Sequence, residues 1–419
     1  MKQRKTIYSL LILVFLFTTL LQGSLVQSTE IPQDQFRESG SWVKYKVEYS
    51  FNYTSLSFPN SFSTWLFRIN NLTSDVDPDI PNSQLSILKK MVVLGADNQS
   101  LDLSDIYGNS IYYFEREFKF GQSNQTFSVY YEYEVTLFQT EWNYNNTNIG
   151  TIGPSLPEYT YTAAKPYIES DDPVIIAKSN EITQGLTDID EKVKVIFEWV
   201  SDYLNYTLLD RAIGAKEALN DGEGDCSEFS SLTVALLKAQ GIPARKVVGL
   251  VMIDPDSEEN IPLYYPEIGK TFSYEQLPGH AWIQYYLPNI GWVTADPTWA
   301  SGSGYKTTGY GDFFDEIDYI HLTLGVGDYY GDGIDPELFY DATKPWIYQE
   351  MGLGPFFVHQ TNNFDYEFDY TFTILDFDLP EQSNKTLQTY AILGIMASLV
   401  VGSMVYAFKP KKRSEPNYY

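Results

Sequence analysis

Residues 221–229 read Asp221-Gly222-Glu223-Gly224-Asp225-Cys226-Ser227-Glu228-Phe229 and hold the only cysteine among 419 residues. Apolar side chains then recur at helical spacing, at Phe229, Leu232, Leu236 and Ala239. This periodicity predicts a helical segment after the loop that ends near Gln240, because Gly241 and Pro243 stop its continuation. Cys226 is therefore expected at a loop-to-helix junction, where unpaired helix N–H groups and the helix dipole stabilise a thiolate.

The segment that follows is expected to form an antiparallel sheet. A buried strand is predicted from Ala244 to Met252, and two further strands at residues 279–286 and 291–298 flank a turn at Pro288-Asn289. Helices are predicted before the cysteine, at residues 173–183, 189–204 and 215–219. The cysteine-containing half of the chain is therefore α+β, with the cysteine helix packed on the sheet.

The register of the two strands can be argued from the pattern. If Tyr285 faces Gly291, the alternation pairs His280 with Asp296 on one face of the hairpin. Directly opposed residues have Cβ atoms about 4.5 to 5.5 Å apart, so an imidazole and a carboxylate there can form a hydrogen bond. A slip of one residue would break this contact.

A cysteine at a helix start, a histidine and an aspartate are the parts of an acyl-transfer triad. The histidine takes the thiol proton or pairs with the thiolate, while the aspartate fixes the ring tautomer and stabilises the imidazolium. Backbone N–H groups near Cys226 would bind the oxyanion. The spacing alone does not bring Cys226 to His280, because that step depends on the fold.

These motifs resemble those of a known family. Gly224-Asp225-Cys226 with its helix, Gly279-His280-Ala281-Trp282 and Asp296-Pro297-Thr298 resemble the transglutaminase-like (papain-like cysteine) superfamily, in its microbial, membrane-anchored branch. The resemblance covers residues 166–299. It implies that Cys226 is the nucleophile, His280 the base and Asp296 the orienting acid. It also implies supporting roles near the oxyanion or the site, for Asp225, Tyr206, Trp282 and Arg245.

The rest of the chain suggests further segments. Residues 31–153 alternate with period two and predict an antiparallel β-sandwich whose aromatic residues form core rather than a sugar-binding platform. A transglutaminase-like domain is expected at 166–345. Residues 346–386 are expected to form a β extension and a stalk, with one or two strands at 356–378 that close a sheet or return to the N-terminal domain.

Both ends have membrane-related patterns. Residues 1–28 have the layout of a secretory signal, and residues 389–408 are uncharged over a length sufficient to span a bilayer. The basic tail at 409–419 predicts a cytoplasmic C-terminus, so the bulk of the chain is expected outside the cell membrane as a single-pass protein. N-glycosylation sequons, consistent with export, occur at Asn52, Asn71, Asn98, Asn124, Asn145, Asn205 and Asn384.

Charge and composition exclude some classes of function. The formal charge of −27 argues against nucleic acid or an anionic membrane surface as partner, because both need Lys and Arg to replace counterions. Three histidines, one cysteine and no HExxH motif predict no metal and no cofactor. His321 and His359 are interpreted as structural histidines, and the acidic residues at 327–335 as a turn rather than a calcium site.

The sequence therefore predicts an extracytoplasmic thiol acyltransferase or hydrolase that acts on amide bonds of proteins or peptides through an acyl-Cys226 intermediate. Water as acceptor gives amidase or protease action, and an amine gives cross-linking. The absence of the extra C-terminal sandwiches of animal cross-linking enzymes favours hydrolysis. The alternative is a non-catalytic surface binding or adhesion protein that uses the same fold as a scaffold.

Overall fold

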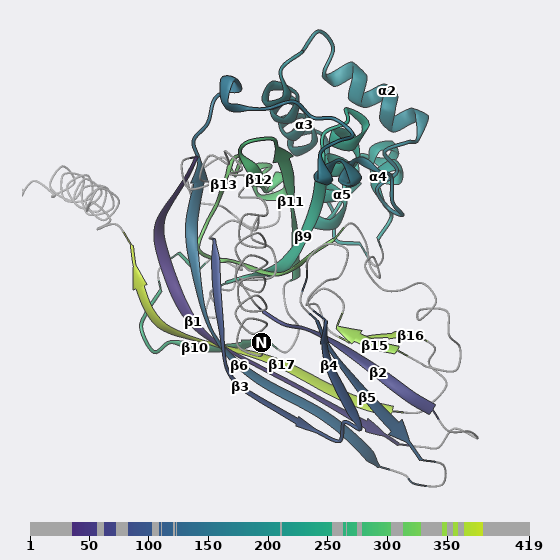
Figure 1. Cartoon of the computed structure of the whole chain (residues 1–419), viewed down its shortest axis with the longest axis vertical. Helices are drawn as coiled ribbons and strands as arrows, with labels where there is room; N and C mark the ends of the chain where they lie inside the picture. Colours follow the sequence, from purple (N-terminus) through teal and green to yellow (C-terminus); the bar gives the residue numbers. More distant parts are fainter. Residues whose placement is uncertain are drawn as a thin grey trace, which may run out of the picture.

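The computed structural model describes residues 36–56, 63–72, 83–102, 109, 111–119, 122, 124–209, 212–253, 263–264, 266–274, 279–302, 313–327, 346–349, 355–358 and 364–379. Long curved strands form one end of the molecule, and helices gather over a smaller sheet at the other end (Figure 1). The candidate site residues belong to this smaller, helix-covered part.

The largest sheet has the order β10-β17-β1-β6-β13, and β3 also pairs with β6. Its strands are β1 (Arg37–Ser55), β3 (Gln84–Leu94), β6 (Gln125–Trp142), β10 (Thr271–Tyr274), β13 (Glu316–Ile317) and β17 (Phe364–Asp378). The alternating residues of β1 are buried, with at most 2% of each side chain exposed, at Val43, Tyr45, Val47, Tyr49, Phe51 and Tyr53. The aromatic residues at these positions are therefore core, as their alternation predicts, and do not form an exposed sugar-binding surface.

Strands from beyond residue 153 complete this sheet. β17 runs antiparallel to β1 from Trp42 opposite Asp378 to Ser55 opposite Phe364, so the alternating segment near the C-terminus does return to the N-terminal part. A second sheet, in the order β16-β15-β2-β5-β4, lies beside it. Its strands are β2 (Ser63–Asn70), β4 (Asn98–Asp102), β5 (Ile111–Phe118), β15 (Trp346–Gln349) and β16 (Pro355–Val358). The sheets expected at 31–153 thus draw on both ends of the chain, and the β-sandwich stays a prediction.

The helices follow the expected order along the chain. They are η2 (Asn146–Asn148), η3 (Pro157–Thr162), α2 (Pro173–Ile182), α3 (Ile189–Tyr203), α4 (Ala215–Asp221), α5 (Cys226–Ala239) and α6 (Pro297–Ala300). Asp172 caps α2 by accepting a hydrogen bond from the Val174 N–H, with Pro173 at the first helical position. α5 begins at Cys226, and Gly241 follows its end with a φ of 72°, a left-handed conformation that glycine adopts without strain.

The smaller sheet has the order β12-β11-β9-β14, and α5 packs against β9 and β11. Its strands are β9 (Ala244–Val251), β11 (Gly279–Leu287), β12 (Gly291–Ala295) and β14 (His321–Val326). Figure 1 shows α3 and α5 over these strands, with α2 and α4 further out. This arrangement is the predicted α+β core, with the cysteine helix on an antiparallel sheet.

The predicted hairpin register is wrong by two residues. Tyr285 pairs with Val293, and Leu287 pairs with Gly291, so the strands extend further toward the turn than expected. A three-residue loop at 288–290 closes the hairpin, and Asn289 in it has a positive φ of 74°. Because the shift is two residues, every side chain keeps its predicted face of the sheet.

The predicted second strand of this hairpin also ends early. β12 stops at Ala295, and Asp296-Pro297 begins α6 with Asp296 as its N-cap. The reason is local, because aspartate followed by proline supplies a capping carboxylate and a φ already suited to a helix, as Asp172-Pro173 does for α2. Asp296 therefore lies just beyond the strand rather than within it.

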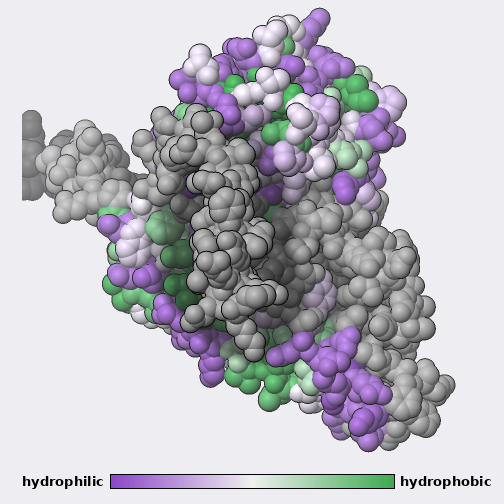
Figure 2. Space-filling model, viewed as in Figure 1, coloured by the Kyte–Doolittle hydropathy of each residue, from purple (hydrophilic) through white to green (hydrophobic). Residues whose placement is uncertain are grey.

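Two hydrophobic cores support these layers. One joins the large sheet to Leu250 of β9, Leu322 of β14 and Trp299 of α6, and the other lies between α2–α5 and the smaller sheet. Hydrophilic residues dominate the visible surface over the helices in Figure 2, as expected for helices with one buried face. The smaller sheet is thus covered on both sides, which removes its side chains from water.

Several sequence-based predictions lie outside the described residues. They are the signal at 1–28, the stalk after residue 379, the membrane span at 389–408, the tail at 409–419, His359, the sequon at Asn384 and most of the acidic turn at 327–335. Within the described part of the chain, no helix combines the length and apolar character that crossing a membrane would require.

The described sequons differ in accessibility. Asn71 is buried, with 7% of its surface exposed, and its side chain accepts a hydrogen bond from the Tyr133 hydroxyl. Asn52, Asn98, Asn124, Asn145 and Asn205 are exposed. A glycan therefore does not fit at Asn71 in the folded protein, because it would have to occupy core volume.

Candidate active site

Cys226 is the first residue of α5 and is half-buried. Asp225 caps the helix, because its Oδ1 accepts a hydrogen bond of 2.9 Å from the Ser227 N–H. Its Oδ2 accepts a 3.4 Å hydrogen bond from the Leu209 N–H. The predicted supporting residue Asp225 thus fixes the start of α5 and ties it to the preceding loop, and the thiol lies where the helix dipole is positive.

A pair of short strands fixes the approach to Cys226. β7 (Asn205–Tyr206) runs parallel to β8 (Glu223–Gly224), with Tyr206 opposite Gly224. A Cβ atom on Gly224 would lie 2.3 Å from Cβ of Glu228, so the first turn of α5 can form here only because residue 224 has no side chain. Tyr206, the predicted neighbour of the oxyanion, therefore lies beside the cysteine loop, and its ring packs 6.4 Å from that of Phe229.

Two buried charged residues under Cys226 were missed by the sequence analysis. The Glu228 carboxylate accepts hydrogen bonds from the Ile213 and Gly214 N–H groups at 3.0 and 3.5 Å. Burial, with a contribution from Asp225, raises the pKa of Glu228 to about 7. Lys246 of β9 donates to the hydroxyl groups of α5, at 2.7 Å to Ser227 and 3.2 Å to Ser231. These contacts hold α5 to the sheet with polar bonds.

His280 of β11 and Asp296 form a buried pair. The distance from His280 Nε2 to Asp296 Oδ2 is 2.6 Å, and both side chains are at most 2% exposed. Asp296 Oδ1 accepts from the Thr298 and Trp299 N–H groups at 2.9 and 3.0 Å. The predicted contact is therefore present, although the carboxylate reaches the imidazole from a helix N-cap rather than from a strand position directly opposite.

The ionisation of this pair follows from its contacts. Burial alone would lower the pKa of His280, but Coulomb attraction to Asp296 and the hydrogen bond that its carboxylate accepts, with smaller contributions from Cys226, raise it to about 9. Burial would raise the pKa of Asp296, yet His280 and His321 hold it well below its usual range. Cys226 contributes through a hydrogen bond to the His280 ring, so the structure brings these two side chains together. Since Nε2 faces Asp296, Nδ1 is the ring nitrogen left for the thiol.

His321 of β14 joins this pair, which the sequence analysis did not anticipate. Its Nε2 lies 3.2 Å from Asp296 Oδ2, and its Nδ1 lies 2.6 Å from Asp318 Oδ1. It is a satisfied buried histidine, as predicted, but its partner is the candidate orienting carboxylate. The available signal was the pair Asp318 and His321 at a spacing of three, yet nothing in the sequence indicated that β14 lies beside β9.

Trp282 and Arg245 have different surroundings. The Trp282 ring packs against the His280 ring with centroids 5.8 Å apart and meets the His321 ring edge-on at 5.1 Å, which restricts both imidazoles. Arg245 donates to Gln284 and stacks on Trp292 at 3.8 Å, further along the sheet from His280. Trp282 thus supports the candidate site, whereas the observed Arg245 contacts stabilise the far end of the hairpin.

Among the described residues, His280, Asp296 and His321 present atoms that could ligate a metal ion within 4.8 Å of one another. Each of these side chains is already hydrogen-bonded to another member of the group, at 2.6 or 3.2 Å. This is hydrogen-bond geometry between ring nitrogens and a carboxylate. We therefore interpret the cluster as a hydrogen-bond network and identify none of the three as a metal ligand.

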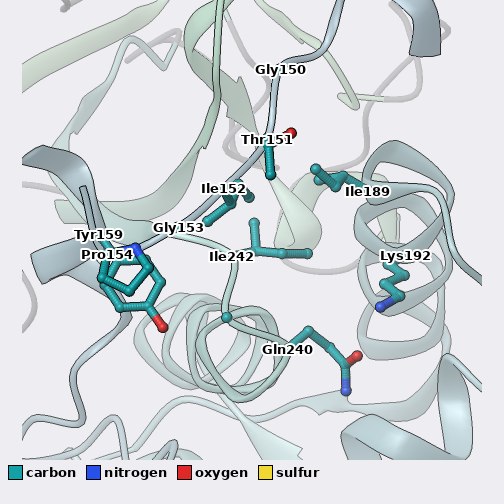
Figure 3. A pocket seen from close by; sticks show the side chains of 11 residues that line it. Gly150, Thr151, Ile152, Gly153, Pro154, Tyr159, Ile189, Lys192, Gln240 and Ile242 are labelled. Carbon is teal, nitrogen blue, oxygen red and sulfur yellow. The ribbon is translucent and has the colours of Figure 1, made fainter. Parts of the chain in front are cut away.

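A cavity of about 430 Å³ lies at the C-terminal end of α5, the opposite end from Cys226, and Figure 3 shows the residues that line it. It is lined by residues 150–154 of the chain leading to η3, by Lys192 of α3 and by Gln240 and Ile242 after α5. At about 1.5 Å per residue, the 14 residues of α5 place this cavity about 20 Å from Cys226. It does not include any of the candidate catalytic residues.

Comparisons with known proteins assign this region to a family. Residues 176–297 match the model of the transglutaminase-like superfamily, a segment that includes Cys226, His280 and Asp296. The uncharacterized protein YebA of Bacillus subtilis (strain 168) is 36% identical over 75 residues, which are 18% of this chain and 9% of YebA. A protein-glutamine gamma-glutamyltransferase of Pseudomonas aeruginosa is 31% identical over 99 residues, which are 22% of this chain and 13% of that protein. The chain thus spans only about a tenth of the length of these relatives.

A solved structure extends the likeness in fold. The crystal structure of a candidate cysteine protease from Cytophaga hutchinsonii superposes with a TM-score of 0.50 and 15% sequence identity. The superposition covers 82% of this chain and 94% of that chain, so it includes strands of the large sheets as well as the helical part. At this identity the likeness concerns the fold.

Proposed function

We propose that the transglutaminase-like domain of this protein is a thiol enzyme that transfers an acyl group from an amide of a protein or peptide to Cys226. In this proposal the Cys226 thiolate attacks the amide carbonyl carbon. The first N–H groups of α5 donate to the resulting oxyanion, and Asp296 keeps the His280 ring oriented. The superfamily match supports the family of chemistry, and the roles of the individual residues are our proposal.

Each step of the proposed reaction balances. The thiolate sulfur forms a bond to the carbonyl carbon. The tetrahedral intermediate then collapses: the C–N bond breaks, the His280 imidazolium gives its proton to the leaving amine, and the acyl group stays on Cys226 as a thioester. In the second half, His280 takes a proton from the acceptor, the acceptor attacks the thioester, and the C–S bond breaks to restore the thiolate. Water as acceptor completes hydrolysis, and an amine completes transamidation.

One observation carries the proposal, the buried contact of 2.6 Å between His280 and Asp296 next to Cys226. Because the pKa of His280 is about 9, the ring is an imidazolium at neutral pH. An imidazolium beside a thiol at a helix N-terminus favours the ion pair that makes cysteine nucleophilic.

The acceptor distinguishes two versions of the activity. The Pseudomonas relative is named a protein-glutamine gamma-glutamyltransferase, and that likeness supports glutamine side chains as acyl donors. We propose hydrolysis as the main outcome, with amine transfer when a primary amine is supplied. Incubation of the full-length protein in detergent with a glutamine-containing protein and a labelled amine separates the two outcomes, because label incorporation reports transfer and peptide or ammonia release reports hydrolysis.

The thiol chemistry itself is tested by iodoacetamide. The chain has one cysteine, so each alkyl group per chain reports Cys226. We expect faster labelling of the native protein at pH 6 than of the same protein unfolded in urea, and we expect His280→Ala to remove this difference. His359→Ala is the matched control, because the motifs do not include that histidine. Native and unfolded chains with the same pH dependence of labelling would refute the ion pair. Unchanged function of the Cys226→Ser variant in the cell would favour the alternative of a non-catalytic surface binding or adhesion protein.

We also propose that the active site faces away from the cytoplasm, on a protein anchored by residues 389–408. The uncharged span followed by basic residues supports this orientation. In intact cells, added protease is expected to degrade residues 36–379 while an epitope on the C-terminal tail stays protected. Protection of both parts would contradict the proposed orientation.

A further inference from the structure

The contacts of His321 differ from those of an ordinary buried histidine. Its side chain is fully buried, and both ring nitrogens face carboxylates, Nδ1 at 2.6 Å from Asp318 and Nε2 at 3.2 Å from Asp296. An ionised carboxylate only accepts hydrogen bonds, so with both carboxylates ionised each ring nitrogen carries a proton. The geometry therefore requires an imidazolium at His321.

The groups around His321 agree with this charge. Asp318 lies three residues earlier, Asp296 belongs to the N-cap of α6, and His280 of β11 has its ring centroid 5.6 Å away. The Tyr264 hydroxyl donates to the second oxygen of Asp318 at 3.2 Å. The aromatic rings of Trp282, Trp299 and Phe313 also pack around His321. Burial would lower the pKa of His321, but Coulomb attraction to Asp318 and the hydrogen bonds to both carboxylates raise it to about 9.

We propose that His321 is a positioning residue for the reaction proposed above, an imidazolium at neutral pH that acts through Asp296 and sets the pH range over which Cys226 and His280 work. The inference rests on the proposed function for its consequence, but the charge of His321 stands on geometry alone. Two carboxylates and one imidazolium leave a single negative charge next to His280, whereas a neutral His321 would leave two. His321 therefore limits how strongly Asp296 holds the proton of His280, and it fixes the carboxylate with a second hydrogen bond.

The expected effect follows from Coulomb's law. Removal of one positive charge 5.6 Å from the His280 ring, at an effective dielectric constant of about 20 to 40, raises the titration midpoint of His280 by about one to two pH units. The Cys226 thiolate is also less stable once the positive charge is removed, so labelling of Cys226 should need a higher pH. A role limited to packing would change the amount of active protein and leave these midpoints in place.

Two variants isolate the charge. His321→Gln removes it while the amide can still donate a hydrogen bond to one carboxylate. Lys216→Gln removes the same charge from a side chain that is 48% exposed and paired with Asp172, so it controls for the change in net charge. The prediction for His321→Gln is an upward shift of about one to two pH units in the titration midpoint of His280, with labelling of Cys226 needing a higher pH as well, and no shift in Lys216→Gln.

Nitrogen NMR of the imidazole rings reads the charge directly. The chain has only three histidines, so His321→Gln and His359→Gln assign all of the ring signals. In the wild-type protein we expect His321 as an imidazolium at pH 7, titrating near pH 9. A neutral tautomer at pH 7 would overturn the inference, even if His321→Gln failed to fold. Unchanged midpoints in a folded His321→Gln variant would also overturn it.

The failure of this inference differs from a failure of the proposed function. If wild-type Cys226 is labelled like the unfolded chain, the thiol enzyme is refuted and with it the catalytic consequence of His321, whatever NMR shows of its charge. If wild-type labelling shows the ion pair and His321→Gln leaves the midpoints in place, the enzyme stands and His321 is only a packing residue.

Discussion

Replacement of Asp296 by asparagine should lower kcat/KM by about 10³ to 10⁴ while the fold is retained. The two oxygens of Asp296 have separate tasks, because Oδ1 caps α6 and Oδ2 faces both imidazoles. Asparagine keeps an amide oxygen for the cap but presents an N–H donor to His280 Nε2. The imidazole must then carry its proton on Nδ1, so it cannot accept the proton of Cys226.

The magnitude follows from the ionisation of His280. Its pKa is about 9, and without Asp296 the burial of the ring leaves the pKa at or below the ordinary value of 6.5. A fall from about 9 to 6.5 corresponds to about 3.4 kcal/mol at 1.36 kcal/mol per pH unit, or about 300-fold in the stability of the imidazolium. The wrong tautomer adds to this loss, which brings the expected decrease to about 10³ to 10⁴.

The assay measures kcat/KM for peptide cleavage or amine transfer, together with the labelling rate of Cys226 at pH 7. Asp315→Asn is the matched control, because Asp315 is also a partly buried carboxylate near β12 but bonds Tyr144 and Tyr285 instead of the histidines. Burial raises the pKa of Asp315 to about 7, so its neutral analogue should alter activity less than about threefold. More than a tenth of wild-type activity in Asp296→Asn would refute the reasoning, and so would equal losses in both variants.

Three further predictions concern stability and pH. The pKa of Glu228 is raised from 4.5 to about 7 in the folded protein, so its contribution to the free energy of unfolding is complete below pH 4.5 and is lost as the pH rises through 7. In urea unfolding, the stability of Glu228→Gln relative to wild type should therefore increase by about 3 kcal/mol between pH 5 and pH 8. Parallel stability curves of the two proteins would contradict this. The raised pKa values of His280 and His321 stabilise the fold fully below pH 6.5, and this stabilisation should be lost by about pH 9 to 10. In thermal melting, the decrease in stability over this pH range should be smaller for His321→Gln than for wild type. Gly249→Ala should lower the free energy of unfolding by at least about 2 kcal/mol and reduce activity, because the added Cβ would lie 1.9 Å from the Leu322 carbonyl oxygen and 2.6 Å from the Trp282 ring. Gly153→Ala is the control: a Cβ there has nothing within 4 Å, so this variant should be nearly neutral in the same unfolding assay.

Local signals in the sequence predicted the individual elements well. Asp172-Pro173 and the apolar stripe after residue 188 located α2 and α3, and the cysteine loop located the loop-to-helix junction at which α5 begins. These signals work because capping and helical periodicity involve residues within four positions of one another. The same capping signal was present at Asp296-Pro297, where the strand interpretation was wrong.

The family, the cysteine helix and the faces of the hairpin were thus determined by the sequence alone. The tertiary structure decided the hairpin register, the return of β17 to β1, and the position of His321 beside Asp296. The physical reason is the two-residue period of a strand, because a slip of two residues leaves every side chain on the same face and produces no signal in the hydrophobic pattern. Pairing between strands far apart in the chain depends on contacts that local patterns do not encode, so only the folded sheet shows that Asp296 holds two histidines rather than one.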